Sequence, residues 1–172
     1  MRAKMLLGRF SVREFYHFTD TRNLPSIRQH GLLSWAELQQ RGIQSVAPGG
    51  NDWSHDADHR VGLDEYVHLC LMKEHPMEYR AREDGRIESS VFLRIAAEVL
   101  HTPGVLFTAD VSNKSGVETL SLSEALEQLD LEAVYTRLDW SDPVVKERRL
   151  VARKYEILVP TLVPSQMISG YD

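Results

Sequence analysis

A glutamate stands inside a segment that otherwise predicts a buried strand. Residues 155–159 read Tyr-Glu-Ile-Leu-Val and are followed by Pro160, an apolar run that ends at a residue unable to continue a strand. Carboxylates are rarely buried unless another group pairs with them, so Glu156 is an unfavourable choice for the stability of such a strand. Its position indicates a role in acid–base or electrostatic chemistry.

His17 is a second ionisable group inside an apolar strand. It lies in Glu-Phe-Tyr-His-Phe, residues 14–18, a segment rich in aromatic side chains. A lone histidine of this kind can be a core residue whose ring is simply hydrogen-bonded. Two distant strands that each carry one acid–base group favour a different interpretation, because adjacent strands would bring His17 and Glu156 to one cleft.

Short strands and helices must position these groups. Strands are expected over residues 14–18, 66–72, 91–95, 105–108 and 155–159, with an edge strand within 161–168. Helices are expected over residues 23–30, 35–42, 122–129 and 130–138, with a short helix or turn at 96–101 and a turn with a charged segment over 75–86. The chain therefore predicts a single α+β domain over residues 1–172.

Composition excludes several classes of protein. Of 172 residues, 42% are hydrophobic and 26% charged, which argues against disordered, collagen-like and coiled-coil chains. The net charge of −5 argues against attachment to nucleic acid by bulk electrostatics. The single cysteine, Cys70, permits no internal disulfide and favours a reducing compartment. Because no apolar run has the length of a signal-peptide core or a membrane span, we expect a soluble, cytoplasmic protein.

A basic segment adjoins the strand of Glu156. Residues 146–154, Lys-Glu-Arg-Arg-Leu-Val-Ala-Arg-Lys, hold five basic side chains and one acidic one. Such a run can be no more than a solvated face. Its position next to the buried carboxylate makes it a candidate contact for an anionic substrate.

Other motifs predict no further chemistry. His55 and His59 have the spacing of a metalloprotease helix, but an aspartate stands where the glutamate is needed and the segment is a glycine-rich loop, so we expect no metal site. Neither a phosphate-binding glycine loop nor a serine nucleophile elbow occurs. Cys70 is expected to be an inert structural thiol, and Arg60, in the long polar loop over 43–62, is by default a solvated side chain.

Four segments, in order along the chain, carry recognisable motifs: FYHFTDTRNLPSIRQHGLLS (Phe15–Ser34), LDEYVHLCLMKEHPMEY (Leu63–Tyr79), VLFTADVSN (105–113) and ERRLVARKYEILVPTLVP (147–164). Together these segments resemble the DarT-type DNA ADP-ribosyltransferases, the toxin half of a bacterial toxin–antitoxin pair. They are similar, in turn, to that family's Tyr-His-x-Thr strand and Asn-Leu-x-x-Ile helix, its Asp-Tyr-Val strand and Pro-Met-x-Tyr turn, its Phe-Thr-Asp strand, and its basic segment before Ala-Glu-Phe-Leu-Val. The resemblance covers nearly the whole chain.

The resemblance implies an ADP-ribosyltransferase fold: a split β-sandwich of short, mostly antiparallel strands with inserted helices, and an NAD⁺ cleft between two small sheets. It implies that NAD⁺ is a co-substrate and that Glu156 and Arg60 are catalytic, with His59 the neighbouring alternative to Arg60. The residues expected to bind NAD⁺ are His17, Thr19, Asn23 and Tyr66, and those expected to contact nucleic acid are Arg148, Arg149, Arg153 and Lys154.

The expected reaction is transfer of ADP-ribose from NAD⁺ to a base of single-stranded DNA. Loss of nicotinamide leaves an oxocarbenium-like sugar, whose charge a carboxylate on a rigid strand can offset. A base within a duplex cannot reach such a cleft, and Trp53 or Trp140 could stack on an unpaired one. An RNA, protein or water acceptor, or a catalytically silent binding module on the same fold, stays open. The resemblance also suggests a separately encoded macrodomain antidote that removes the modification.

Overall fold

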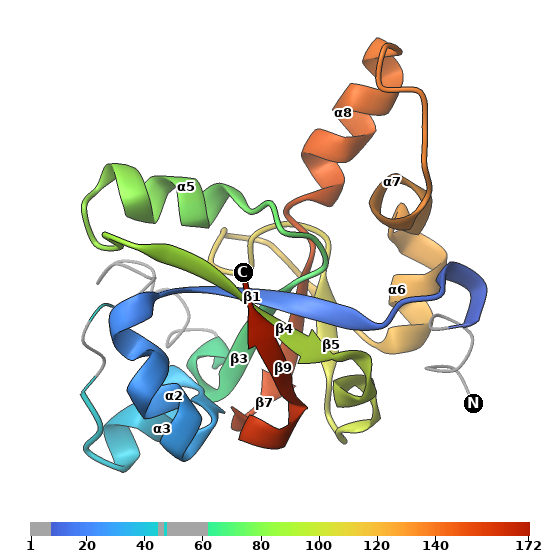
Figure 1. The fold of residues 1–172 in the computed structure, drawn as a ribbon. Helices are drawn as coiled ribbons and strands as arrows, with labels where there is room; N and C mark the ends of the chain where they lie inside the picture. Colours follow the sequence, from blue (N-terminus) through green and yellow to red (C-terminus); the bar gives the residue numbers. More distant parts are fainter. Residues whose placement is uncertain (1–7, 45–46, 48–61) are drawn as a thin grey trace.

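The computed structural model describes residues 8–44, 47 and 62–172 (Figure 1). The strands are β1 Glu14–Asp20, β2 Leu32–Leu33, β3 Tyr66–Cys70, β4 Ser90–Ala96, β5 Leu106–Thr108, β6 Thr119–Leu120, β7 Glu156–Pro160, β8 Leu162–Val163 and β9 Ile168–Tyr171. The α-helices are α2 Leu24–His30, α3 Trp35–Gln40, α5 Pro76–Glu83, α6 Leu122–Gln128, α7 Leu131–Tyr135 and α8 Pro143–Ala152. Short 3₁₀ turns cover Thr21–Asn23, Leu63–Glu65, Ala97–His101 and Ser165–Met167. The predicted α+β class is confirmed.

The main sheet opens between two of its strands. In the described chain it has seven strands in the order β6-β5-β7-β3-β1-β4-β9, and β2 pairs with β8 in a separate two-stranded sheet. Strand β1 pairs with β4 from Glu14 opposite Ala96 to Asp20 opposite Ser90, but it pairs with β3 only at Tyr16 opposite Cys70. The expected cleft between two small sheets is therefore an opening within one antiparallel sheet, between β1 and β3.

Strand β7 is apolar on both faces because it lies inside the four-stranded part of the sheet, β6-β5-β7-β3, on one side of the opening. It pairs with β5 on one side and β3 on the other, and Ile157, Leu158 and Val159 are fully buried. Side chains from several strands complete the core around it. The largest of them are Phe15, Leu69, Leu93, Ile95 and Phe107. Glu156 is thus the one carboxylate in a strand whose other buried residues are apolar.

The helices near the opening begin and end where capping residues predict. Helix α2 has Pro25 in its first turn and ends at Gly31, which has the positive φ typical of such a stop. The side chain of Ser34 accepts a hydrogen bond from the N–H of Glu37 and starts α3. Further along, the capping box that starts α6 at Ser121 is present.

Two helices were not predicted. Residues 75–86, expected as a turn and a charged segment, contain α5, and the basic run 146–154 lies largely within α8. Each helix begins with a proline after a capping side chain, His75 before α5 and Asp142 before α8. Both helices have few buried apolar residues, so the periodicity of a buried face is weak. In Figure 1 α8 projects away from the sheet, at the end of the molecule opposite α2 and α3.

The described part of the chain contains no helix that is both long and apolar enough to cross a bilayer.

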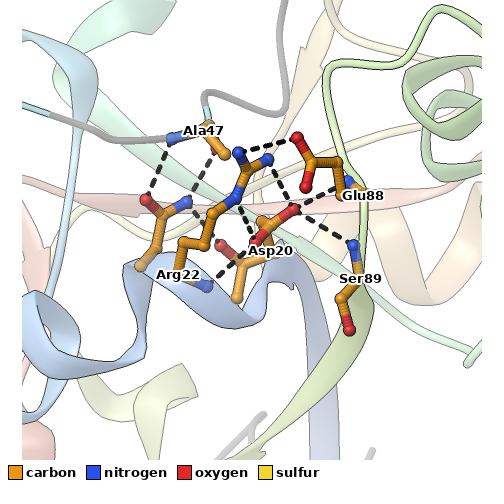
Figure 2. A network of polar contacts seen from close by, with 7 residues as sticks. Asp20, Arg22, Ala47, Glu88 and Ser89 are labelled. Atoms are coloured by element: carbon orange, nitrogen blue, oxygen red, sulfur yellow. Dashed lines mark hydrogen bonds and ion pairs between the residues drawn. The ribbon is translucent and has the colours of Figure 1, made fainter.

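A buried carboxylate joins the end of β1 to the start of β4. Figure 2 shows Asp20, which is fully buried, between the side chain of Arg22 and the backbone of residues 88 and 89. Its Oδ1 accepts hydrogen bonds from the backbone N–H and Nε of Arg22, both at 2.9 Å. Its Oδ2 accepts from Nη2 of Arg22 at 2.9 Å and from the N–H groups of Glu88 and Ser89 at 2.8 and 3.2 Å. The Arg22 side chain, helped by these N–H groups, lowers the pKa of Asp20 in spite of its burial.

The first prediction concerns this carboxylate. We expect Asp20→Asn to reduce the free energy of unfolding at pH 7 by about 1–3 kcal/mol, since the backbone N–H groups of Glu88 and Ser89 lose the charged oxygen that accepts from them. Because folding depresses the pKa of Asp20, the contribution is complete above the unfolded-state pKa of about 4 and is lost as the pH falls through the folded-state value.

Urea unfolding between neutral and acid pH tests this. The difference between the wild type and Asp20→Asn should shrink as the pH falls below about 4, and a difference that does not change with pH would contradict the prediction. Asp84→Asn, which removes the ion pair of an exposed carboxylate with Arg86, is the control and should have little effect at any pH.

Candidate active site

The opening between β1 and β3 leads into a cavity of about 210 Å³. The predicted catalytic residue Glu156 and all four residues predicted to bind NAD⁺ line it: His17, Thr19, Asn23, Tyr66 and Glu156. Residues from four strands and from the segment around α2 and α3 thus meet at one place. Arg60 and its neighbour His59 lie outside the described residues, so the catalytic role of Arg60 stays a prediction.

Glu156 is buried in the wall of this cavity and surrounded by donors. The residue is 5% exposed, and its Oε2 accepts a hydrogen bond from the backbone N–H of Ser112 at 3.0 Å. Nδ1 of His68 lies 3.5 Å from Oε2, and Nε2 of His75 lies 3.2 Å from Oε1. Burial alone would raise the pKa of Glu156, but the contacts with His68 and His75 outweigh it and lower the pKa. The carboxylate is therefore ionised at neutral pH.

His17 presents an uncharged ring to the same cavity. Its Nδ1 lies 2.8 Å from the carbonyl oxygen of His68, so Nδ1 carries the proton and donates it, which leaves a lone pair on Nε2. Burial, together with the charges of His68 and His75, lowers the pKa of His17 to about 4. At neutral pH Nε2 is consequently a hydrogen-bond acceptor, suited to a sugar hydroxyl.

Thr19 and Asn23 are buried and bonded to protein groups. Nδ2 of Asn23 donates to Oγ1 of Thr19 at 3.1 Å and to the carbonyl oxygen of Ala47 at 2.7 Å. The N–H of Ala47 donates back to Oδ1 of Asn23 at 3.2 Å, so the side-chain amide holds the backbone of Ala47, which also lines the cavity. Both residues shape the wall, and their contact with NAD⁺ stays a prediction.

Three polar residues next to Glu156 were not predicted as site residues: His68, His75 and Ser112. His68 lies within β3, two residues before Cys70, the residue opposite Glu156, so its side chain is on the same face of the sheet as Glu156. Ser112 lies after β5, and its Oγ is 2.9 Å from Nδ1 of His68. The only sequence signal for His75 is its position before Pro76, where a helix can begin. Cys70 lies buried next to Glu156, and burial raises the pKa of its thiol, in agreement with a structural role.

The basic run next to β7 is paired with acidic side chains. The pairs are Arg148 with Asp130 at 2.6 Å, Arg149 with Glu74 at 3.7 Å, Arg153 with Glu74 at 3.2 Å and Lys154 with Asp110 at 3.9 Å. The guanidinium of Arg149 also lies over the ring of Trp140, which is 45% exposed. Exposed ion pairs of this kind contribute little to stability, and the contact of these four basic residues with nucleic acid stays a prediction.

The arrangement is suited to stabilising a positive charge next to a bound sugar. A strand fixes an ionised carboxylate in a place that excludes most water, where electrostatic interactions are stronger than in solution. A neutral imidazole that accepts hydrogen bonds lies on another wall of the cavity. Apolar side chains of Phe18, Trp35, Leu38 and Met77 supply surfaces on which a flat ring can pack.

Comparisons with known proteins agree with this reading of the site. The family model described as "ssDNA thymidine ADP-ribosyltransferase, DarT" matches residues 16–171. Among curated proteins, the chain is 24% identical over 164 residues to a DNA ADP-ribosyl transferase–DNA ADP-ribosyl glycohydrolase fusion protein of Thermosipho africanus. That match covers 92% of this chain and 42% of the fusion protein, so the chain spans less than half of this relative's length.

Solved structures share the fold. DarT of Thermus sp. 2.9 in complex with ADP-ribosylated single-stranded DNA superimposes with a TM-score of 0.68 at 24% identity, covering 92% of this chain and 79% of that one. The NAD⁺ complex of the same protein gives a TM-score of 0.62, with 92% and 80% covered. DarTG of Thermosipho africanus in complex with ADP-ribose gives 0.63 at 20% identity, with 93% and 43% covered. The predicted ADP-ribosyltransferase fold is confirmed. Because the family model matches residues 16–171, nearly the whole chain, the chain belongs to the DarT family of single-stranded DNA thymidine ADP-ribosyltransferases.

Proposed function

We propose that this chain transfers ADP-ribose from NAD⁺ to a thymine base of single-stranded DNA and releases nicotinamide. The observation that carries the proposal is the placement of Glu156, an ionised and buried carboxylate, in the wall of the cavity that His17 also lines. Membership of the DarT family supports the reaction class, and the DNA and NAD⁺ complexes of the Thermus protein support the two substrates.

In this reaction the bond between the nicotinamide nitrogen and the anomeric carbon breaks, and a bond from that carbon to the thymine ring nitrogen forms. The positive charge that grows on the sugar is offset by Glu156, which can also hydrogen-bond a ribose hydroxyl. The thymine N–H must lose a proton, and Glu156 is the ionised base within the cavity that can accept it. His17 would accept a hydrogen bond from NAD⁺ through Nε2, and Arg60 would stabilise the departing group.

The part of the cavity that the described residues line would hold the nicotinamide end of NAD⁺. Its apolar walls suit the nicotinamide ring and its polar groups suit the adjoining ribose. Tyr66, half-buried at the start of β3, and Thr19 and Asn23 would then lie next to these two moieties.

The partners proposed are single-stranded DNA and an enzyme that removes the modification. The Thermosipho relative joins a transferase to a glycohydrolase in one protein, which supports a pairing of the two activities. We propose that this chain acts as the toxin of such a pair and that the antidote is a macrodomain protein.

The reaction is tested by incubating the chain with NAD⁺ and oligonucleotides of single base composition, then measuring mass and free nicotinamide. We expect the mass of ADP-ribose to be added only to thymine-containing single strands, with nicotinamide released in equal amount. Release without any acceptor would identify an NAD⁺ glycohydrolase, and label on RNA or protein alone would identify another acceptor. Binding of single strands with no release would identify a silent module.

The second prediction places the DNA strand along the basic run. Arg153 and Glu74 form an ion pair at 3.2 Å. If Arg153 contacts a DNA phosphate, removing the arginine and removing the glutamate should change DNA affinity in opposite directions. Arg153→Gln should weaken binding of a thymine oligonucleotide and reduce the slope of log K against log salt by about 0.7, the value for one phosphate contact on a single strand. Glu74→Gln should strengthen binding, because it frees both Arg149 and Arg153.

Fluorescence anisotropy over a range of salt concentrations measures these changes. Arg28→Gln is the matched control, an exposed arginine that contacts Tyr171 on the far side of the molecule. A change of the same sign in the Arg153 and Glu74 variants would mean that the pair is structural and that the strand runs elsewhere.

A further inference from the structure

Two histidines lie next to the carboxylate of Glu156, one at each oxygen, and backbone contacts fix a different tautomer on each ring. Nε2 of His68 lies 3.1 Å from the carbonyl oxygen of Leu63, so in the neutral ring Nε2 carries the proton and Nδ1 is a lone pair turned to Ser112 and Glu156. His68 can therefore donate to the carboxylate only when its ring is protonated.

His75 has the opposite tautomer. Its Nδ1 accepts a hydrogen bond from the N–H of Met77 at 3.3 Å, as the N-cap of α5, so the proton of the neutral ring is on Nε2. Nε2 lies 3.2 Å from Oε1 of Glu156. His75 can thus donate to the catalytic carboxylate whether or not its ring is charged.

Among the described residues, Glu156 is the acceptor nearest to the Nε2–H of His75. The residue is 4% exposed, and its ring is stacked on that of Phe18 with centroids 5.8 Å apart, which fixes its orientation. The N–H lies off the direct line to Oε1, and within the described chain the buried Nε2 has no hydrogen-bond partner of good geometry. A small rotation of the Glu156 carboxylate would complete the bond, and the cost of leaving a buried donor unsatisfied favours that rotation.

We propose that His75 is a positioning residue for the transfer reaction: its Nε2–H holds Oε1 of Glu156, so that the carboxylate stays ionised and faces the cavity. The proposal rests on the proposed function of Glu156. The hydrogen bond from the Met77 N–H orients the His75 ring, and the ring in turn orients the Glu156 carboxylate. The start of α5 is thereby coupled to the reacting centre.

The other groups that face Glu156 do not replace this donor. They come from β3, from β5 and the segment that follows it, and from β1 across the opening. They are His68, Cys70, Thr108, Ser112 and His17. The Ser112 N–H binds Oε2, the Cys70 thiol is a weak donor whose pKa burial raises, and His17 gives its proton to a backbone carbonyl. Loss of His75 removes one of the groups that lower the pKa of Glu156, so burial should move this pKa upward.

Two substitutions of His75 distinguish its role in positioning Glu156 from its role as the N-cap of α5. His75→Asn keeps a side-chain oxygen where it can accept the Met77 N–H, because asparagine is a favoured N-cap, but it is too short to reach Glu156. His75→Gln places its amide nitrogen near the position of Nε2 and loses the cap. We expect His75→Asn to remain folded at the temperature of the assay, with kcat reduced roughly tenfold, as when a partner that orients a reactive ligand is removed.

In His75→Asn the acid limb of the kcat–pH profile should also move to higher pH, while the KM for NAD⁺ changes little. His75→Gln should unfold at a lower temperature but keep the wild-type profile. A wild-type kcat and profile in His75→Asn, or equal losses of kcat in both variants, would overturn the proposal.

A second measurement does not depend on activity. In protein labelled with ¹³C at the glutamate carboxyl carbons, the Glu156 signal is identified by its absence from Glu156→Gln, and its titration is followed from pH 7 downward. It should titrate at higher pH in His75→Asn than in the wild type and in His75→Gln. Identical titrations in all three would overturn the proposal. Absence of nicotinamide release by the wild type would instead refute the proposed function, and the titration would still decide the role of His75.

Discussion

Glu156→Gln is expected to reduce nicotinamide release and ADP-ribose transfer by at least ~10²–10³-fold, the usual effect of removing one preorganised electrostatic group. Glutamine has the shape of glutamate, so the strand β7 and its pairings with β3 and β5 can be retained. What is lost is the negative charge next to the sugar and the base for the thymine proton. Both losses act in the transition state, so kcat falls more than affinity for NAD⁺.

The same substitution should lower the stability of the chain modestly. Because folding lowers the pKa of Glu156, the ionised carboxylate stabilises the folded state at neutral pH through its contacts with His68 and His75. Glutamine has nearly the same volume and its side-chain oxygen can still accept the hydrogen bond from the Ser112 N–H, but it lacks the charge. We therefore expect a slightly lower unfolding temperature, with the variant still folded at the temperature of the assay.

The measurement combines free nicotinamide, oligonucleotide mass and thermal unfolding on one protein preparation. Glu127→Gln, an exposed carboxylate on α6, is the matched control and should leave all three unchanged. Transfer by Glu156→Gln at the wild-type rate would remove Glu156 from the mechanism. Loss of activity together with a large fall in unfolding temperature would show that the carboxylate is structural.

Local signals made much of this fold predictable. The stop of α2 at Gly31, the cap of α3 at Ser34 and the capping box at Ser121 depend on neighbouring residues alone, and each was confirmed. Helices α5 and α8 were missed because their stability depends on one capping side chain each and on contacts with distant segments. Propensity within a short window does not contain that information.

The site was predictable in part for the same reason. Glu156 and His17 are ionisable groups within apolar strands, a contrast that the sequence shows directly, and the structure brings both to one cavity. His75 and Ser112 reach Glu156 through the fold, from positions 81 and 44 residues away, and nothing near them in the sequence marks them. Likewise, the acidic partners of the basic run come from segments before α5, after β5 and before α7, so the run looked unpaired in the sequence.

Gly31 is the residue at which we expect the largest loss of stability from adding a single methyl group. Its φ of 79° and ψ of −177° lie in a region that only glycine adopts without strain. A Cβ at this position would lie 2.6 Å from the carbonyl oxygen of Val163, a backbone atom that cannot rotate away. Val163 pairs with Leu32 in the two-stranded sheet, so the close approach of the chain at Gly31 is what allows β2 and β8 to pair.

Gly31→Ala should therefore lower the free energy of unfolding by about 3–5 kcal/mol, the sum of backbone strain and overpacking, and the unfolding temperature by roughly 8–15 °C. Gly42→Ala is the matched control, because Gly42 also has a positive φ, of 65°, but nothing lies within 4 Å of an added Cβ. There only the backbone strain remains, about 1–2 kcal/mol. Gly31 also lines the cavity, so the displaced β2 should raise the KM for NAD⁺ in the folded fraction. Equal losses of stability in the two variants would show that the backbone angle alone, and not the contact with Val163, requires glycine at position 31.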